Sequence, residues 1–381
     1  MSNLTNKLET ILGVTFIAGN RVQVLRNGDE IFPAILEEIS RSRESIDFVT
    51  YVYWQGNIAI KFAKALGERA AAGVKVRVLL DAFGAYPMRS ELIELMQRQG
   101  VQVLHFRPIA RWKIWKLDNR THRKILVCDS KVAFTGGVGI AEEWEGNARN
   151  ASEWRDTHFR ITGPAVKVIH SAFISNWSEA KDSCDLRIPD YSPLPEQGGA
   201  RLLTVASPSS LNWSTIALMF RTLIASAERN ISIATAYFVA DDALTTMLCR
   251  AVERGVTVQI LIPGDNSDSR LSQLSGRFNF QKLLDAGIKI FRYQPTMMHA
   301  KIMLVDNHIA VVGSANMNHR SMSKDEEICL IIDDQPTVDT LNLDYEEDIK
   351  KSVPIDLKQW KDRSIWLRIG EACARLFRHE L

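Results

Sequence analysis

The stretch MHAKIMLVDNHIAVVGSANMNHRS, residues 298–321, decides the fold class of this 381-residue chain, because it is a near copy of an earlier one. The earlier stretch is THRKILVCDSKVAFTGGVG, residues 121–139. Each contains a histidine and a lysine two positions apart, continues as an apolar strand, turns at an aspartate and ends in a second short strand with small residues. The chain therefore contains a repeated unit built around one histidine-lysine pair.

The histidine and the lysine of each stretch are expected on one face of their strand. Side chains alternate faces, so His122 points the same way as Lys124, and His299 the same way as Lys301. For a single copy, the simplest interpretation is a buried structural histidine beside a lysine whose head reaches water. Two matched copies argue against it, because a structural histidine has no reason to keep a lysine partner through a duplication.

The repeat extends beyond these two stretches. SIDFVTYVYW, residues 45–54, is matched by NISIATAYFV, residues 230–239, and each is followed by a helical pattern and a second apolar strand. Strands separated by helices are typical of a parallel sheet, because a parallel crossover needs a helix to return the chain. The sequence predicts an α/β fold of two similar domains, each a mostly parallel or mixed sheet flanked by helices, related by a pseudo-twofold axis.

The chain divides at KDSCDLRIPDYSPLPEQGGA, which has three prolines and a Gly-Gly pair without hydrophobic periodicity and is typical of a linker. The predicted divisions are an N-terminal domain, a linker, a C-terminal domain and a basic amphipathic helical tail, at residues 1–180, 181–200, 201–350 and 351–381.

Composition narrows the function classes. Lys and Arg number 47 against 45 Asp and Glu, and the net charge of +2 is far from the basic excess typical of nucleic-acid binding. The five cysteines are odd in number and form no CxxC pair, so neither disulfides nor a zinc site is indicated and a reducing compartment is expected. No apolar run reaches the roughly 18 residues of a membrane span, and no signal-peptide pattern is present at the N-terminus. We expect a protein of the cytosol or of a membrane surface.

Packed about a pseudo-twofold axis, the two units would bring two imidazoles and two ammonium groups together. One neutral imidazole can act as a nucleophile while a protonated one acts as a general acid. The two lysines can bind the non-bridging oxygens of a phosphate and supply the charge stabilisation that a metal ion otherwise provides. These residue types predict phosphodiester chemistry without a metal or another cofactor.

The pattern H-x-K-x4-D, present twice and followed by GS-x-N after the second copy, resembles the phospholipase D superfamily, whose members carry paired HKD motifs. The likeness runs from about residue 20 to about residue 335 and implies two phospholipase D-like domains. On that resemblance the catalytic set is His122, Lys124, Asp129, His299, Lys301 and Asp306, with the two aspartates expected to brace their turns. In that family an acidic residue downstream orients the catalytic imidazole, and Asp156 and Glu327 match that position.

Further residues complete the expected orienting and phosphate-binding set. The small residues Gly137 and Ser314 let a ligand approach the backbone closely, and the resemblance adds Asn316 of the GS-x-N pattern. Gly139 stands where the family usually has the matching asparagine, so the two half-sites are not equivalent in their phosphate contacts. Family habit makes His122 the nucleophile and His299 the general acid and base.

The phrases NGDEIFPAILEEI, WRDTHFRITGPAV and SANMNHRS resemble bacterial cardiolipin synthases of the type without transmembrane helices. That resemblance implies transfer of a phosphatidyl group through a phosphohistidine to phosphatidylglycerol, with phosphatidylethanolamine as a further candidate substrate. It also implies a peripheral protein on the cytoplasmic face of the inner membrane. Alternatives are a phospholipase D that uses water, a nucleic-acid phosphodiesterase, which the near-neutral charge disfavours, and a lipid-binding protein without catalysis.

Two segments are candidates for contact with a membrane. Trp112, Lys113, Trp115 and Lys116 alternate aromatic and basic side chains, a pattern suited to the lipid headgroup region. The same pattern also suits a base-stacking strip for nucleic acid or an ordinary solvated loop. In the tail, Ile365, Ile369, Ala372 and Leu376 share one helical face, which suits a membrane surface or packing on the protein itself.

Overall fold

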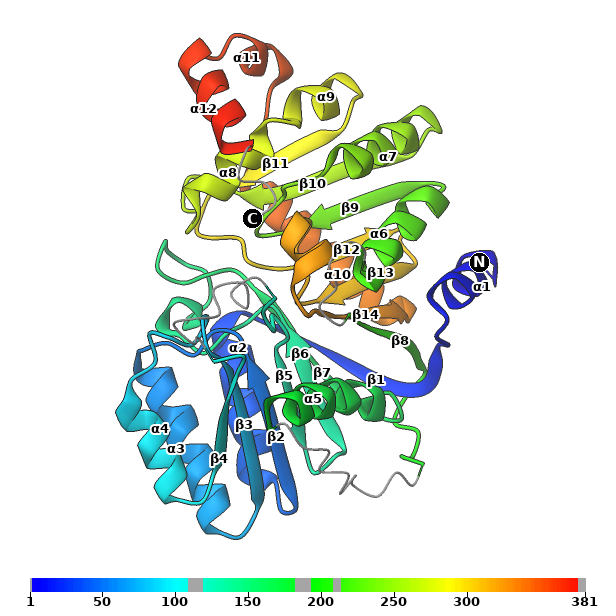
Figure 1. Ribbon diagram of the computed structural model, residues 1–381. Coiled ribbons are helices and arrows are strands. Elements are labelled where there is room, and N and C mark those ends of the chain that lie inside the picture. Colours follow the sequence, from blue (N-terminus) through cyan, green and yellow to red (C-terminus); the bar gives the residue numbers. More distant parts are fainter. Residues whose placement is uncertain (1, 109–118, 182–192, 208–213, 376–381) are drawn as a thin grey trace.

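A single continuous sheet of 15 strands runs through the protein, as Figure 1 shows for the computed structural model. The structure describes residues 2–108, 119–181, 193–207 and 214–375. The strand order is β15-β11-β10-β9-β12-β13-β14-β8-β1-β7-β6-β5-β2-β3-β4. If the edge strand β15 is left out, the remaining strands form two series of equal order that meet at the centre of the sheet. One series runs from β11 to β8 and the other from β4 to β1, so the two halves of the sheet repeat one topology.

The N-terminal half of the sheet, β1 to β7, alternates with helices in the first part of the chain. Its elements are β1 (Ile17–Arg26), α2 (Asn27–Arg41), β2 (Ser45–Thr50), α3 (Asn57–Ala71), β3 (Lys75–Asp81), α4 (Ser90–Arg98), β4 (Gln102–Phe106), β5 (Ile125–Cys128), β6 (Val132–Gly136), β7 (Thr157–Thr162) and α5 (Val166–Lys181). A short 3-10 helix, Glu142–Trp144, lies between β6 and β7.

The C-terminal half, β8 to β14, repeats this series. Its elements are β8 (Ala200–Ala206), α6 (Thr215–Ser226), β9 (Asn230–Ala234), α7 (Asp242–Glu253), β10 (Thr257–Pro263), α8 (Arg270–Arg277), α9 (Phe280–Asp285), β11 (Lys289–Tyr293), β12 (Ile302–Val305), β13 (Ile309–Gly313), a π-helical turn (Arg320–Lys324), β14 (Ile328–Asp333) and α10 (Gln335–Lys350). Side-chain caps begin α6 and α7, since Ser214 and Asp241 accept hydrogen bonds from the free N–H groups of Ala217 and Leu244.

The prediction of an α/β fold with two similar halves is confirmed. The sheet is mixed, because most of its strand pairs are antiparallel. Parallel pairs are confined to β2–β3–β4 and β9–β10–β11, where the intervening helices provide the crossovers. The other pairs are antiparallel, including β1 with β8 at the centre of the sheet, where the two halves join. The two expected sheets are therefore one sheet.

Helices cover both faces of the sheet, which explains why its strands are apolar on both sides. Along β5, Leu126 packs into the core beneath α2 and α3, while Ile125 and Val127 pack into a second core on the opposite face. That second core is shared by both halves, because α5 contributes Phe173 and α10 contributes Leu341 to the same cluster. The shared core holds the halves in one fixed relation.

The chain ends do not follow the predicted divisions in their packing. Helix α1 (Ser2–Leu12) belongs by chain order to the N-terminal domain, yet Leu8 is buried in the core of the C-terminal half, against α6. The tail forms β15 (Ser352–Pro354), α11 (Leu357–Lys361) and α12 (Ile365–Arg375), and α12 packs on α8. Most of the predicted linker lies outside the described residues.

The tail helix α12 packs on the protein through a different face from the one expected. Glu371 and Ala374 are buried, whereas Ile369 of the predicted apolar face is 49% exposed and Ala372 is also exposed. Glu371 is buried together with its partner, because Arg363 donates to its carboxylate at 2.9 Å. Within the described ranges, no helix combines the length and the hydropathy that crossing a bilayer requires.

Candidate active site

Two equivalent hairpins, β5–β6 and β12–β13, carry the repeated motifs. Asp129 and Ser130 form the turn of the first with φ of 50° and 54°, and Asp306 and Asn307 form that of the second with 54° and 52°. Left-handed conformations at both central residues are typical of type I′ hairpin turns, and Asp and Asn tolerate them well.

The two motif aspartates brace these turns and do not line the substrate cavity. The Asp129 carboxylate accepts hydrogen bonds from the backbone N–H groups of residues 43–45, and that of Asp306 accepts from residues 228–230. Each aspartate follows its strand, whereas the histidine and the lysine precede it. Their inclusion in the catalytic set needs correction, because neither carboxylate is among the groups that surround the histidines.

Backbone bridges between the two halves decide how the site is assembled. The N–H of His122 donates to the carbonyl of Glu326 at 2.9 Å, which places the first motif beside the start of β14 in the other half. In the same way, the N–H of His299 donates to the carbonyl of Arg155 at 2.7 Å, beside the start of β7. Each histidine therefore lies next to the acidic residue that follows the opposite motif.

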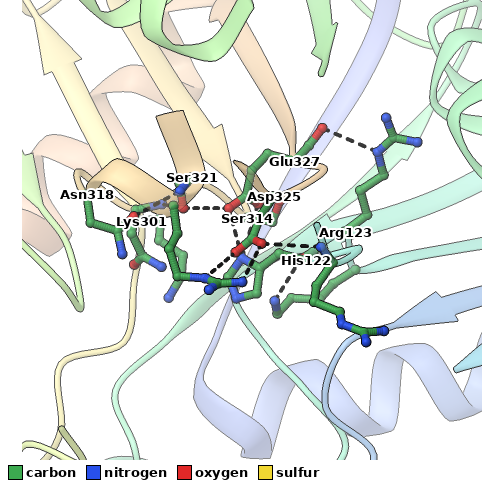
Figure 2. Close-up of polar contacts among 12 residues, drawn as sticks. His122, Arg123, Lys301, Ser314, Asn318, Ser321, Asp325 and Glu327 are labelled. Carbon is green, nitrogen blue, oxygen red and sulfur yellow. Dashed lines mark hydrogen bonds and ion pairs between the residues drawn. The ribbon is translucent and has the colours of Figure 1, made fainter. Parts of the chain in front are cut away.

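His122 is oriented by Glu327 of the C-terminal half. Its Nδ1 lies 3.0 and 3.1 Å from the two carboxylate oxygens, a contact that Figure 2 draws with its surroundings. The hydroxyl groups of Ser314 and Ser321 each donate to Glu327 at 2.5 Å. The predicted orienting role of Glu327 and the predicted position of Ser314 thus meet at one carboxylate, which Ser321 also holds.

His299 is oriented by Asp156 of the N-terminal half. Its Nδ1 lies 2.7 Å from an Asp156 carboxylate oxygen, and the indole N–H of Trp144 donates to the same oxygen at 2.9 Å. Gly137 takes the place that Ser314 has in the other half, and a side chain there would collide with the Asp156 carboxylate. Glycine at this position therefore serves the carboxylate that orients His299.

These contacts fix the protonation of each imidazole. An ionised carboxylate only accepts hydrogen bonds, so Nδ1 of each histidine carries the proton and donates it. In a neutral ring, Nε2 then holds the free lone pair. Nitrogen Nε2 of His122 is thus available to attack phosphorus or to take a proton from an alcohol. In His299, the Nζ of Lys301 lies 3.2 Å from Nε2 and 3.0 Å from Nδ1, so the lysine shares that side of the ring.

Burial, charges and hydrogen bonds together shift the pKa values of the two imidazoles and the two carboxylates of the site. Burial lowers the pKa of His299 to about 3, with a contribution from the Lys301 charge, and lowers that of His122 as well. Burial alone would raise the pKa of Asp156 and Glu327, but the charges and hydrogen bonds of the facing histidines and lysines outweigh it and lower both. In the free protein the site therefore has ionised carboxylates and neutral imidazoles.

The two lysines lie beside the two imidazoles. The Nζ of Lys124 donates to the carbonyl of His122 at 2.9 Å, and the Nζ of Lys301 donates to that of His299 at 2.5 Å. Burial lowers the pKa of Lys124 to about 7 and that of Lys301 to about 8, against the pull of the nearby carboxylates. Their charge in the free protein is thus conditional on pH, and a bound phosphate would favour the charged forms.

Both histidines and Lys124 line one cavity of about 240 Å³ between the two halves. Its walls also contain groups that sequence analysis missed: Tyr51, Val52, Trp54, Trp144, Trp154, Tyr237, Asp268, Ser272, Asn318, Arg320, Ser321 and Asp325. The only sequence signal for them was that several occupy the quoted phrases around the motifs, such as WRDTHF and SANMNHRS. Aromatic rings dominate near His299, with Trp144 and Trp154 centred 5.1 and 5.4 Å from the imidazole.

Asn316 lines the cavity, whereas Gly139 at the equivalent position does not. The Asn316 side chain is buried, and its Oδ1 has no hydrogen-bond partner among the described residues. In the N-terminal half, Val52 occupies the space that a side chain at Gly139 would need. The expected inequality of the two half-sites therefore has a steric origin.

The remaining predicted residues are Trp112, Lys113, Trp115 and Lys116, all of which lie outside the described residues. They belong to the segment just before the first motif, and the described residues resume at Asn119.

The chain matches the family model described as "Cardiolipin synthase, PLD-like domain" over residues 35–177 and 220–349. Cardiolipin synthase 1 of Bacillus cereus is 33% identical over 383 residues, covering 98% of this chain and 75% of the relative. Cardiolipin synthase 1 of Bacillus anthracis is 34% identical over 363 residues, covering 93% of this chain and 71% of the relative.

Among solved structures, phosphatidylserine synthase of Haemophilus influenzae superposes with a TM-score of 0.72, covering 99% of this chain and 100% of the other. The two sequences are 14% identical, so this likeness concerns the fold alone.

Proposed function

The chain belongs to the phospholipase D-like cardiolipin synthase family, and we propose that its cavity transfers a phosphatidyl group to phosphatidylglycerol through a phosphohistidine. The observation that carries the proposal is the crossed pair of histidine-carboxylate contacts around one cavity with both lysines beside them. Such an arrangement orients two imidazoles through their Nδ1 atoms and leaves their Nε2 atoms for the two roles that phosphodiester exchange requires, attack on phosphorus and proton transfer.

In the first step, Nε2 of His122 attacks phosphorus of the donor lipid. The P–N bond forms, the bond from phosphorus to the headgroup oxygen breaks, and protonated His299 gives its proton to the departing oxygen. The lysine ammonium groups stabilise the charge on the non-bridging oxygens without a metal ion. The anionic phosphodiester supplies the charge that raises the pKa of His299 from its low value in the empty site.

In the second step, the terminal hydroxyl of phosphatidylglycerol attacks the phosphohistidine. His299, now neutral, accepts the hydroxyl proton, the new P–O bond forms and the P–N bond to His122 breaks. Both histidines return to their starting states. The aromatic wall of Tyr51, Trp54, Trp144 and Trp154 favours a lipid alcohol over water as the acceptor, because apolar walls limit the water that reaches phosphorus.

We further propose that the mouth of the cavity faces a membrane on the cytoplasmic side. Phe83 and Tyr86, in the loop after β3, are 55% and 83% exposed. The loop borders the cavity, because the indole N–H of the lining residue Trp54 donates to the carbonyl of Gly84 at 2.8 Å. Exposed aromatic rings beside a lipid-binding cavity suit the headgroup region.

The test is product identification. Purified protein is incubated in EDTA with phosphatidylglycerol vesicles, with and without phosphatidylethanolamine, and the lipids are read by mass spectrometry. Cardiolipin with released glycerol or ethanolamine is the expected result and names the donor. Phosphatidic acid alone would mean hydrolysis, and loss of activity in EDTA would contradict the role given to the lysines.

A further inference from the structure

An aspartate stands on the rim of a cavity that binds an anionic phosphodiester. Asp268, in the loop between β10 and α8, lines the same cavity as both histidines. No lysine, arginine or histidine of the described ranges lies within 4.0 Å of its carboxylate. The charge of Lys301 acts on this carboxylate without forming an ion pair with it. A carboxylate that is not ion-paired repels the phosphate group of the substrate, so its presence here has a cost to phosphate binding that another interaction must offset.

A tyrosine hydroxyl holds this carboxylate. The hydroxyl of Tyr237 donates to Oδ2 of Asp268 at 2.5 Å. This hydrogen bond does not explain why an aspartate stands at this position. Asp268 is exposed, and water could accept a hydrogen bond from a tyrosine hydroxyl at the rim equally well. A carboxylate has about four acceptor positions, so beside Tyr237 and the neighbouring backbone N–H groups of Asp268 and Ser269 it keeps acceptor capacity for a ligand.

Tyr237 also links Asp268 to the chemistry. Its ring packs edge-on against the imidazole of His299, with centroids 6.4 Å apart. His299 is the group that protonates the departing alcohol and deprotonates the entering one, so both alcohols react beside it. An alcohol that extends from His299 along the tyrosine side chain brings its far end to Asp268.

We infer that Asp268 is a specificity-determining residue whose carboxylate accepts a hydrogen bond from the second polar group of the headgroup alcohol that reacts at His299. The ligand class is a small alcohol with a further hydrogen-bond donor, either the second hydroxyl of a glycerol headgroup or the ammonium of ethanolamine. The inference rests on the proposed function, because it assigns a contact to the alcohol that enters and leaves in that reaction.

The equivalent loop of the N-terminal half supports this assignment. It follows β3 as the Asp268 loop follows β10, and its exposed residues are Phe83, Tyr86, Pro87 and Arg89, with no carboxylate among them. One side of the mouth thus presents aromatic rings and the other a carboxylate. Acyl chains suit the first side, and polar headgroup atoms suit the second.

The experiment offers the protein three soluble acceptors at equal concentration. Full-length protein is incubated with phosphatidylglycerol vesicles, deuterium-labelled glycerol, ethanolamine and 1-propanol, and the labelled phosphatidylglycerol, phosphatidylethanolamine and phosphatidylpropanol are quantified by mass spectrometry. Because 1-propanol has no second donor, its product measures transfer without the Asp268 contact. Wild-type protein is expected to favour glycerol and ethanolamine over 1-propanol.

The variant Asp268→Ala is expected to reduce both preferences about 10- to 100-fold, the effect of losing a hydrogen bond to a charged group. Asp268→Asn keeps an oxygen acceptor and loses the charge, so the ethanolamine preference falls further than the glycerol preference. The matched control is Asp265→Asn, which removes a carboxylate from the same loop, where Asp265 is 79% exposed and pairs with Arg292.

Unchanged preferences in both Asp268 variants would overturn the inference, as would an equal loss in Asp265→Asn. Wild-type protein that shows no preference among the acceptors would also overturn it, while leaving the proposed transfer intact. Wild-type protein that forms none of the three products and no cardiolipin would instead remove the proposed function, and the assignment of Asp268 with it.

Discussion

The two halves of the active site have the same reactive groups in different surroundings. Each half supplies one imidazole, one ammonium group and one carboxylate, and each carboxylate orients the imidazole of the other half. Glu327 is held by the hydroxyls of Ser314 and Ser321, whereas Asp156 is held by the indole of Trp144. Because the proposed reaction needs two imidazoles in different protonation states, a duplicated site gains from surroundings that differ.

The aromatic side chains around the two histidines also differ between the halves. The aromatic rings near His299 are those of Trp144, Trp154 and Tyr237, while Tyr51 packs edge-on against His122 at 5.2 Å. Burial lowers the pKa of His299 to about 3 in the free protein. In the proposed mechanism, His299 becomes an acid when the substrate charge enters, which links proton transfer to occupancy of the site.

The largest expected effect comes from removing either imidazole. His122→Ala and His299→Ala should each lower transfer at least about 1,000-fold, because one loses the nucleophile and the other loses the proton-transfer group. The two variants should differ in the covalent intermediate. His299→Ala should still form a phosphatidyl-protein adduct with a donor that has a good leaving group, whereas His122→Ala should form none, as read by intact-protein mass spectrometry.

His308→Ala is the matched control, because His308 lies outside the cavity near the surface, 3.4 Å from Asp333. An adduct in His122→Ala and none in His299→Ala would reverse the roles assigned to the two histidines. Full turnover in either variant would contradict the two-histidine mechanism altogether.

The next effect concerns the crossed carboxylates. Glu327→Gln and Asp156→Asn should each lower kcat about 100-fold or more, since the facing Nδ1–H loses its charged acceptor. Although burial has the largest influence on both histidines, each carboxylate raises the pKa of its partner. In titrations followed by NMR, Glu327→Gln should therefore lower the pKa of His122 and leave His299 unchanged, and Asp156→Asn should do the reverse.

Glu347→Gln serves as the control, because Glu347 is exposed on α10 and pairs only with Lys350 among the described residues. A Glu327→Gln variant that moves the pKa of His299 instead of that of His122 would mean that each carboxylate serves its own half.

A smaller effect is expected from pH. Burial lowers the pKa of Lys124 to about 7 and of Lys301 to about 8, so the free protein loses both charges as pH rises through this range. The ratio kcat/KM, which reports groups of the free enzyme, should fall about tenfold or more between pH 7 and pH 9. The kcat value should fall at higher pH, because bound phosphate raises both lysine pKa values.

Stability should follow pH in the opposite direction. The unfolded chain keeps both lysines protonated up to about pH 10, so it binds more protons than the folded chain between pH 7 and pH 10. These two groups therefore make the free protein more stable as pH rises through that range. A decline of kcat/KM that is accompanied by a decline in thermal stability would assign the loss to unfolding and not to the lysines.

The smallest effect concerns the two sides of the cavity mouth. Phe83→Ala with Tyr86→Ala should weaken sedimentation with anionic vesicles about tenfold, because two exposed aromatic side chains no longer enter the headgroup region. Leu343→Ala is the control, since Leu343 is 64% exposed on α10. Equal binding by the loop variant and the control would separate this loop from the membrane.

Sequence analysis predicted the repeat and the reactive groups because both depend on local patterns. Apolar strands with turn residues between them predicted the hairpins. His122 and Lys124 line one cavity as predicted, although they precede β5 and do not lie in the strand itself. The phospholipase D resemblance led to Asp156 and Glu327, whose contacts with the histidines are present in the structure. The buried face of the tail helix differs from the predicted one. In the packing of α12 on α8, Glu371 and Ala374 are buried in place of the predicted apolar residues.

By itself, the sequence determined that two equivalent α/β halves each present a histidine, a lysine and a nearby carboxylate. The tertiary structure decided that these groups cross between the halves, since the bridges from His122 to Glu326 and from His299 to Arg155 join segments far apart in the chain. The tertiary structure also decided which residues line the cavity. Trp144, Tyr237 and Asp268 come from segments that no common sequence repeat connects. Period-based patterns describe one element at a time, whereas the cavity forms only where the edges of two halves meet.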